Sequence, residues 1–196
     1  MSTFAPITVI VDADSVIFDW ETQFVTEFRH DFPNLRCAGV GERFDYNINA
    51  GLNEEEIAAT RSIMDKPGFY RRLPLIAGAA AALNDMEAQG IDVVICTSPW
   101  VSNQSCASDK LNSIEDHIGE GWARRTIIAS DKTGVRGDIL VDDKPDVLGH
   151  FEPIWEHVYF TQSWNSARTD HRRIDSWAEW PAMLDAELEK RRLRAA

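Results

Sequence analysis

The sequence predicts an α/β fold in which helices flank a parallel β-sheet, with a small and mostly helical insertion after the first strand. Two observations predict the sheet. Short runs of β-branched residues, beginning at residues 7–12, recur along the chain, and longer helical stretches separate them. This alternation is typical of parallel sheets that are covered on both faces. A third observation predicts the insertion, because residues 20–75 carry no strand signal of comparable clarity.

The first part of the chain contains one predicted strand and two predicted helices. Residues 7–12 are short, continuous and β-branched, which indicates a fully buried strand. Residues 19–31 predict a helix that ends before Pro33. After an irregular stretch rich in Gly and Asn, a second helix is predicted to begin after Asn53. This residue is a suitable N-cap, and the acidic residues that follow it suit the helix dipole.

From Ile76 onward, strands and helices alternate more regularly. Strands are predicted at residues 91–97, 126–130, 138–143 and 157–161, and helices at 76–90, at 104–119 and from 176 onward. A chain of 196 residues can form one sizeable core with a small inserted subdomain. We therefore expect one Rossmann-like core, residues 1–19 and 76–196, and one helical cap, residues 20–75.

Composition and charge restrict the possible partners. The net charge of −12, from 32 acidic and 20 basic side chains, argues against binding to a nucleic-acid polymer but not to a small phosphorylated ligand. No apolar run approaches the ~18–20 residues of a membrane span, and the first residues lack the pattern of a signal peptide. Three cysteines at spacings unlike those of metal sites predict free thiols and a cytoplasmic location.

Polar side chains stand at the exits of four predicted strands. These residues are Asp12 and Asp14, Thr97 and Ser98, Lys132, and Asp142 and Asp143. Because ligands of open parallel sheets bind outside the carboxyl ends of the strands, we expect these side chains to converge. The chain has no G-x-G-x-x-G fingerprint and no Walker A sequence, which excludes the usual dinucleotide and P-loop sites.

The chemistry of the converging groups points to phosphoryl transfer. Neighbouring carboxylates repel one another unless a cation lies among them, and an all-oxygen ligand set favours Mg²⁺ beside a phosphate. Lys132 would neutralise the phosphate, while Thr97 and Ser98 would donate hydrogen bonds to it. Asp12 is the better nucleophile, and Asp14, which projects the same way in extended backbone, could serve as acid and base.

Each of these motifs also has an ordinary explanation when it is taken alone. An Asp-x-Asp pair or the CTS segment can cap a helix, DDKPD can form a turn, and Lys132 can be a solvated surface lysine. The occurrence of all four in order, each at a strand exit, favours a catalytic site.

The four motifs, DADSV, ICTS, Lys132 and VDD, resemble those of the haloacid dehalogenase (HAD) superfamily of phosphatases. The resemblance extends to the 5'(3')-deoxyribonucleotidases. Segments similar to theirs are ICTSP (95–99), SDKTGVRGDILVDDKPD (130–146), WEHVYFT (155–161) and SWAEW (176–180). The similarity thus runs from Ile7 to about Trp180. It implies an HAD core with a C1-type cap and Mg²⁺ as cofactor.

The resemblance also implies catalytic and metal-binding roles. Asp12 would be the nucleophile and a Mg²⁺ ligand. Asp14 would be the acid and base, and its backbone carbonyl would bind the metal. Asp143 would be a further metal ligand, with Asp142 beside it in the acidic pair.

For the substrate, the resemblance implies that Thr97 and Lys132 hold the phosphate, with Ser98 close by. Lys110 falls where these enzymes have a lysine near the substrate.

Aromatic side chains of the cap are the candidates for contacts with a nucleotide base. These are Phe44 and Tyr46, with Trp20 reaching in from the core and Phe69 or Tyr70 behind. A ring stacked on a base typically contributes ~1–3 kcal/mol. Ordinary packing in the cap or core is the alternative for each of them, and for Phe69 and Tyr70 it is the favoured one.

The sequence departs from the family pattern at two places. Ser15 stands where the family commonly has Gly, and residues 40–52 of the cap are shorter than in the family and differ most from it. Base and sugar preference are set in that part of the cap, so the sequence leaves both open.

The expected function is a Mg²⁺-dependent hydrolase, a phosphomonoesterase that converts (deoxy)nucleoside 5'-monophosphates to nucleoside and phosphate. One alternative is the same chemistry on another small phosphoester, such as a sugar phosphate. Another is a non-catalytic HAD-like domain that binds a nucleotide or a protein partner. The resemblance further suggests a homodimer.

Overall fold

The computed structural model describes residues 7–195 and contains a six-stranded sheet in the order β3-β2-β1-β4-β5-β6. All five strand pairings are parallel. The strands are β1 Thr8–Val11, β2 Asp92–Thr97, β3 Ile127–Ile128, β4 Ile139–Asp142, β5 Glu156–Phe160 and β6 Arg172–Ile174. The α/β fold with a parallel sheet is therefore confirmed.

Strand β1 lies in the middle of the sheet, where apolar side chains are buried on both faces. Val9 and Val11 belong to the main hydrophobic core, whereas Ile10 packs with Leu140 and Trp155 in a smaller cluster. Successive side chains of a strand point to opposite faces, so a continuous β-branched run suits this central position. Because β2 and β4 flank β1, the exits of these three strands are neighbours.

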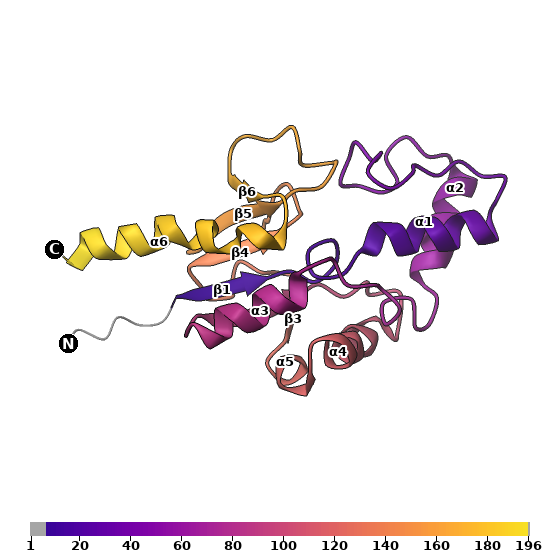
Figure 1. The fold of residues 1–196 in the computed structure, drawn as a ribbon. Coiled ribbons are helices and arrows are strands. Elements are labelled where there is room, and N and C mark those ends of the chain that lie inside the picture. The colour runs from indigo at the N-terminus through magenta and orange to yellow at the C-terminus, as the bar shows by residue number, and fades with distance from the viewer. Residues whose placement is uncertain (1–6, 196) are drawn as a thin grey trace.

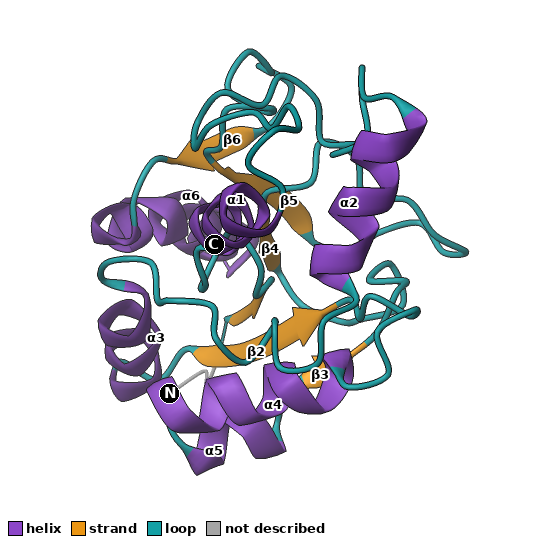
Figure 2. Cartoon of the chain, turned by 90° about the vertical axis from the view of Figure 1, so that its right-hand side faces the viewer, coloured by secondary structure: helices purple, strands orange, loops and turns teal. Residues whose placement is uncertain are grey.

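The helices of the core pack on one face of the sheet, where they share the main hydrophobic core, and the other face is covered by Val135, Val147 and Trp155, which lie outside helices. The helices are α1 Trp20–Asp31, α2 Glu54–Met64, α3 Ala79–Ala88, α4 Cys106–His117, α5 Glu120–Arg124 and α6 Trp180–Ala195, with a short 3-10 turn at Trp177–Glu179. Helices α3 and α6 lie on the side of the main core, and α4 and α5 pack together on the same side beside β2 and β3 (Figure 2). Among the described residues, no helix is both long enough and apolar enough to cross a membrane.

Helices α1 and α2 lie beyond the carboxyl ends of the strands, set apart from the sheet (Figure 1). They pack against each other, and α2 begins at the predicted N-cap, where Asn53 and Glu56 form a reciprocal capping box. The chain enters and leaves this region through adjacent segments. The Asp19 N–H donates to the carbonyl of Pro74 at 2.8 Å, and the Ile76 N–H donates to the carbonyl of Ile17 at 2.8 Å.

Four details differ from the predicted elements. Strand β3 covers only Ile127–Ile128, and α3 begins at Ala79, because Gly78 has a left-handed φ of 81°. Helix α5 and strand β6 were not predicted. Strand β6 is an edge strand of sequence RRI, so it lacks the apolar run that marks a buried strand. Residues 1–6 and 196 of the predicted core lie outside the described residues.

Candidate active site

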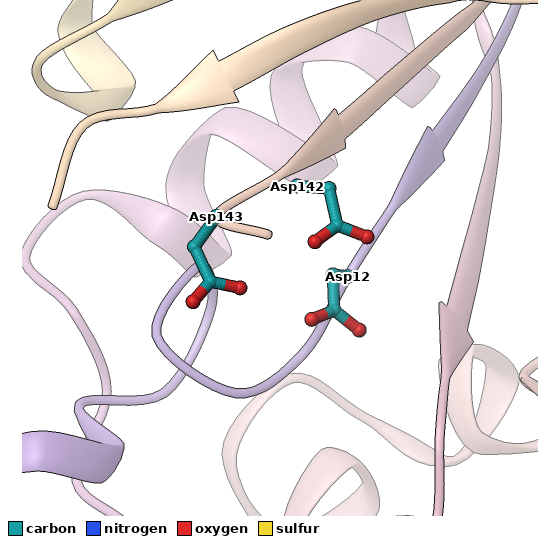
Figure 3. A group of neighbouring side chains, drawn as sticks. All are labelled: Asp12, Asp142 and Asp143. Carbon is teal, nitrogen blue, oxygen red and sulfur yellow. The ribbon is translucent and has the colours of Figure 1, made fainter. Parts of the chain in front are cut away.

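Three aspartates from two neighbouring strand exits face one another. Asp12 directly follows β1, Asp142 ends β4, and Asp143 follows it. The two exits are fastened together, since the Asp12 N–H donates to the carbonyl of Val141 at 2.9 Å. One carboxylate oxygen from each aspartate lies within 4.8 Å of the others, and all three residues are buried (Figure 3). The parallel register of β1 and β4 therefore builds this acidic cluster.

Lys132 is the cation built into the cluster. Its Nζ lies 2.6 Å from Asp12 Oδ1 and 2.6 Å from Asp142 Oδ2, and the residue is 6% exposed. Burial opposes the charge of Lys132, but the attraction of both carboxylates raises the pKa of the ammonium. It therefore stays protonated and partly offsets the three acidic groups.

One lysine does not neutralise three buried carboxylates. Burial raises the pKa of Asp12, helped by repulsion from Asp142 and opposed by Lys132. Burial followed by repulsion from Asp142 and Asp12 raises the pKa of Asp143 well above its ordinary value. A further cation would relieve this repulsion, and an all-oxygen donor set suits Mg²⁺. The residues present therefore fit the implied metal.

A second lysine forms hydrogen bonds with residues of both the DADSV and the ICTS motif. Lys110, on α4, donates to Asp14 Oδ2 at 2.7 Å, to Thr97 Oγ1 at 2.9 Å and to the Ser98 carbonyl at 2.7 Å. These three bonds use all three donors of the ammonium group. The Asp14 carboxylate is thereby turned toward Lys110 and stands outside the acidic cluster. Its other oxygen, Oδ1, is buried and has no hydrogen-bond partner in the described structure.

The pKa of Asp14 is raised mainly by burial, and the charge of Lys110 opposes this shift. A carboxyl group with a raised pKa holds a proton at higher pH and can donate it, as a general acid must. The Ser98 hydroxyl is used differently from the prediction, because it donates to the carbonyl of Ala129 at 3.0 Å. Thr97, by contrast, accepts from Lys110 and keeps its own hydroxyl proton free to donate.

All of these groups line one open cavity of ≈ 530 Å³ between the sheet and the α1–α2 region. Asp12, Asp14, Thr97, Ser98, Lys110, Lys132, Asp142 and Asp143 lie at its sheet end. Its remaining walls are partly apolar and include Trp20, Tyr46, Met64, Tyr70 and Trp100. The cavity therefore joins a charged end to an aromatic one.

Of the five aromatic candidates, three line the cavity and two do not. Trp20 and Tyr46 line the cavity, as does Tyr70. Phe44 does not line it: its side chain is 78% exposed and borders a smaller, separate hollow on the α1 side. Phe69 is fully buried and packs edge-on against Trp20. The structure therefore does not place Phe44 in the wall of the cavity.

Three residues at the site were missed by the sequence analysis. Arg43 lines the cavity, lies 4.1 Å from the ring centroid of Trp164, and donates to the carbonyls of Asp45 and Tyr46. The indole of Trp164 in turn donates to the Asp143 carbonyl at 3.1 Å. Trp100 lines the cavity just past the second motif. Trp100 and Trp164 follow strand exits, so the rule that found the aspartates could have found them too.

Ser15 also lines the cavity, in a conformation that explains why Gly is common at this position. Its φ is 60°, in the left-handed region that L-residues rarely occupy. The turn is held by a 2.7 Å bond from the Ser15 N–H to the carbonyl of Phe18 and by a 2.6 Å bond from Gln162 Nε2 to the Ser15 carbonyl. These bonds keep a serine in a turn that suits glycine.

Comparison with known proteins gives consistent results. The model of the family described as "5' nucleotidase, deoxy (Pyrimidine), cytosolic type C protein" matches residues 5–191. The cytosolic 5'(3')-deoxyribonucleotidase of Homo sapiens is 34% identical over 195 residues, which cover 92% of this chain and 94% of that protein. The mitochondrial 5'(3')-deoxyribonucleotidase of Mus musculus is 34% identical over 192 residues, with coverages of 91% and 86%.

The fold is shared more widely. The protein YfnB of Bacillus subtilis, whose magnesium-bound crystal structure is described as that of a HAD-hydrolase, aligns with a TM-score of 0.56. The alignment covers 93% of this chain and all of that one, at 13% sequence identity. The predicted HAD fold is therefore confirmed.

Proposed function

This chain belongs to the 5'(3')-deoxyribonucleotidase family within the HAD superfamily, and we propose that it hydrolyses (deoxy)nucleoside 5'-monophosphates to nucleoside and phosphate. The observation that carries the proposal is the convergence of Asp12, Asp14, Thr97 and Lys132 at the charged end of one cavity. The cavity volume of ≈ 530 Å³ falls within the range of small-molecule sites, about 300–1,000 Å³.

The acidic cluster would hold Mg²⁺. We assign Asp12 and Asp143 as carboxylate ligands, with Asp142 beside them and Asp14 contributing its backbone carbonyl. When bound, the metal supplies positive charge for the phosphate and removes the repulsion among the carboxylates.

The first chemical step is assigned to Asp12 and Asp14. A carboxylate oxygen of Asp12 forms a bond to phosphorus as the bond from phosphorus to the nucleoside oxygen breaks. Asp14 gives its proton to that departing oxygen. Lys110 orients Asp14, and Thr97 and Lys132 bind the phosphate oxygens.

The second step regenerates the enzyme. Asp14, now a carboxylate, takes a proton from a water molecule whose oxygen attacks phosphorus. The bond between phosphorus and the Asp12 oxygen breaks, which releases inorganic phosphate and restores the Asp12 carboxylate. One difficult displacement is thus divided into two easier ones.

We further propose that residues 20–75 act as a cap over the core formed by residues 1–19 and 76–196. The charged end of the cavity comes from the core, and Trp20, Tyr46, Met64 and Tyr70 come from the cap. This division assigns the phosphate to the core and the nucleoside to the boundary between core and cap.

A panel of monophosphates with detection of free phosphate tests the proposal. We expect faster turnover of deoxynucleoside 5'-monophosphates than of sugar phosphates, and no turnover by a folded Asp12→Asn variant. Equal rates on sugar phosphates would contradict the nucleotide assignment. Full turnover by Asp12→Asn would remove the assigned nucleophile.

The metal is tested separately. Dialysis against a chelator should abolish turnover, and Mg²⁺ should restore it. Added Mg²⁺ should also raise the unfolding temperature of the metal-free protein, because a ligand that binds only the folded state stabilises it. An unfolding temperature that does not respond to Mg²⁺ would contradict the metal site.

Two further points belong to the same proposal. Cys37, Cys96 and Cys106 are free thiols, which supports a reducing compartment such as the cytoplasm. The expected homodimer is tested by light scattering during size-exclusion chromatography, where a monomeric mass would contradict it.

A further inference from the structure

Two of the four aromatic rings that line the cavity in the described part of the chain, Trp20 and Tyr70, are already engaged in packing. Trp20 is stacked on Phe24 with ring centroids 4.8 Å apart and meets Phe69 edge-on. Tyr70 is 2% exposed, meets Phe69 edge-on and lies 5.2 Å from the ammonium of Lys110. Trp20 also has the guanidinium of Arg43 5.7 Å from its ring centroid and is only 8% exposed, so neither ring offers an open face to a flat ligand.

Trp100 and Tyr46 differ from these two rings. Within residues 7–195, Trp100 makes no ring–ring or cation–π contact, although it lines the cavity and packs partly against the main core. Tyr46 is 43% exposed, and its one ring–ring or cation–π contact in that part of the chain is with the ammonium of Lys144, at 5.8 Å. Trp100 follows β2 on the core side, whereas Tyr46 belongs to the cap.

The orientation of Trp100 is fixed by polar bonds. Its indole Nε1 donates to Asp65 Oδ1 at 2.7 Å, and its backbone N–H donates to Cys106 Sγ at 3.1 Å. The Ser102 hydroxyl also donates to Asp65 Oδ1, at 2.5 Å. Asp65 is the C-cap residue of α2, so the bond that sets the tilt of the indole crosses from the cap to the core.

The same junction is anchored by further hydrogen bonds. Asn103 Nδ2 donates to the carbonyls of Met64 and Lys66, both at 2.9 Å, and the Gly68 N–H donates to Asp109 Oδ2 at 2.9 Å. The wall that carries Trp100 is therefore rigid before any ligand binds. A preorganised aromatic wall loses little side-chain entropy when a ligand stacks on it.

We propose that Trp100 is a specificity-determining residue that provides the core-side stacking surface for the nucleotide base, and that Asp65 is the positioning residue that fixes it. The inference rests on the proposed function and adds a residue to it. Because the only indole donor is used by Asp65, Trp100 offers the base its π face alone. Such stacking tolerates different bases while rejecting substrates that have none.

The test compares a deoxynucleoside 5'-monophosphate with deoxyribose 5-phosphate, which has the same phosphoester and no base. For Trp100→Ala we expect about a ten-fold rise in KM for the nucleotide, within the range of base stacking, and a kcat close to that of the wild type. Values for deoxyribose 5-phosphate should stay unchanged. Trp100→Phe keeps a ring but lacks the indole donor, so it should recover part of the loss and resemble Asp65→Ala. Val101→Ala, at a neighbouring residue that is 81% exposed, is the matched control.

Asp65→Ala should raise KM for the nucleotide by about three-fold, since the ring is kept but its tilt is not. Ser102→Ala, which removes the other donor to Asp65 Oδ1, should leave KM unchanged. Unchanged nucleotide KM in Trp100→Ala would overturn the inference, and so would an equal loss on both substrates. If that variant does not fold, Trp100→Leu is judged by the same criteria. A wild type that does not prefer the nucleotide would instead contradict the proposed function.

Discussion

Removal of the buried lysine should show how strongly the acidic cluster depends on positive charge. In Lys132→Met the side chain keeps similar bulk, but Asp12 and Asp142 lose an ammonium that lies 2.6 Å from each. Breaking a buried ion pair by removing one partner typically costs about 3–5 kcal/mol. With Lys132 only 6% exposed and bound to two carboxylates, we expect a loss within this range.

Urea unfolding followed by circular dichroism, in the presence of a chelator, measures this loss. Lys144→Met is the matched control, because Lys144 lines the same cavity and has no carboxylate within ion-pair distance among the described residues. Its unfolding free energy should change by less than about 0.5 kcal/mol. Without the chelator, millimolar Mg²⁺ should restore part of the stability of Lys132→Met, since the metal ion can supply positive charge to the cluster. An unfolding midpoint of Lys132→Met equal to that of the wild type would refute the reasoning.

Three other predictions follow from single residues. Ser15→Gly relieves a left-handed φ of 60° and should stabilise the protein by about 0.5–1 kcal/mol, measured by urea unfolding; a destabilised variant would contradict this. Burial raises the pKa of Glu21, so the contribution of this group to stability is lost as pH rises above 4.5, its ordinary pKa. The stability of Glu21→Gln relative to wild type should therefore increase from pH 4 to pH 7 in thermal unfolding, and a difference that does not vary with pH would refute the assignment. Phe44→Ser should leave KM for nucleotides within about two-fold of wild type, because the ring is outside the cavity. A large rise in KM would show that Phe44 contacts the substrate.

The strands and the charged end of the site could be predicted because both follow from short-range patterns. Continuous β-branched runs mark buried strands, and the rule that parallel strands place their ligands at the carboxyl ends brings Asp12, Thr97, Lys132 and Asp143 together. The structure places all four at one cavity. The position of β1 between β2 and β4 is what makes the rule work here.

The aromatic end could be predicted only in part, because it depends on irregular backbone. Trp20, Tyr46 and Tyr70 line the cavity as candidates named from the sequence. Trp100 was missed, however, and Phe44 lies outside the cavity. Residues 40–52 have no periodicity, so the sequence does not tell that Tyr46 lines the cavity while Phe44 points away from it. The contact of Arg43 with Trp164 joins residues more than a hundred positions apart, so no local sequence pattern predicts this contact. The partner of Ser98 was missed for a similar reason, since its hydroxyl is used by the carbonyl of Ala129 after the neighbouring strand β3.

The adjacent entry and exit of the α1–α2 region have a consequence for modularity. Phe18 pairs with Leu75 in an antiparallel bridge, and hydrogen bonds on both sides of it join the two crossings into one double-stranded stem. The region between the two crossings is joined covalently to the core only through that stem, although Asp65, Met64 and Gly68 also form hydrogen bonds with the core. Without the region, the two chain ends at the stem would lie close enough to be rejoined. A foreign segment with similarly spaced ends could be grafted there, which would let one phosphate-handling scaffold acquire new leaving groups by exchanging a single piece.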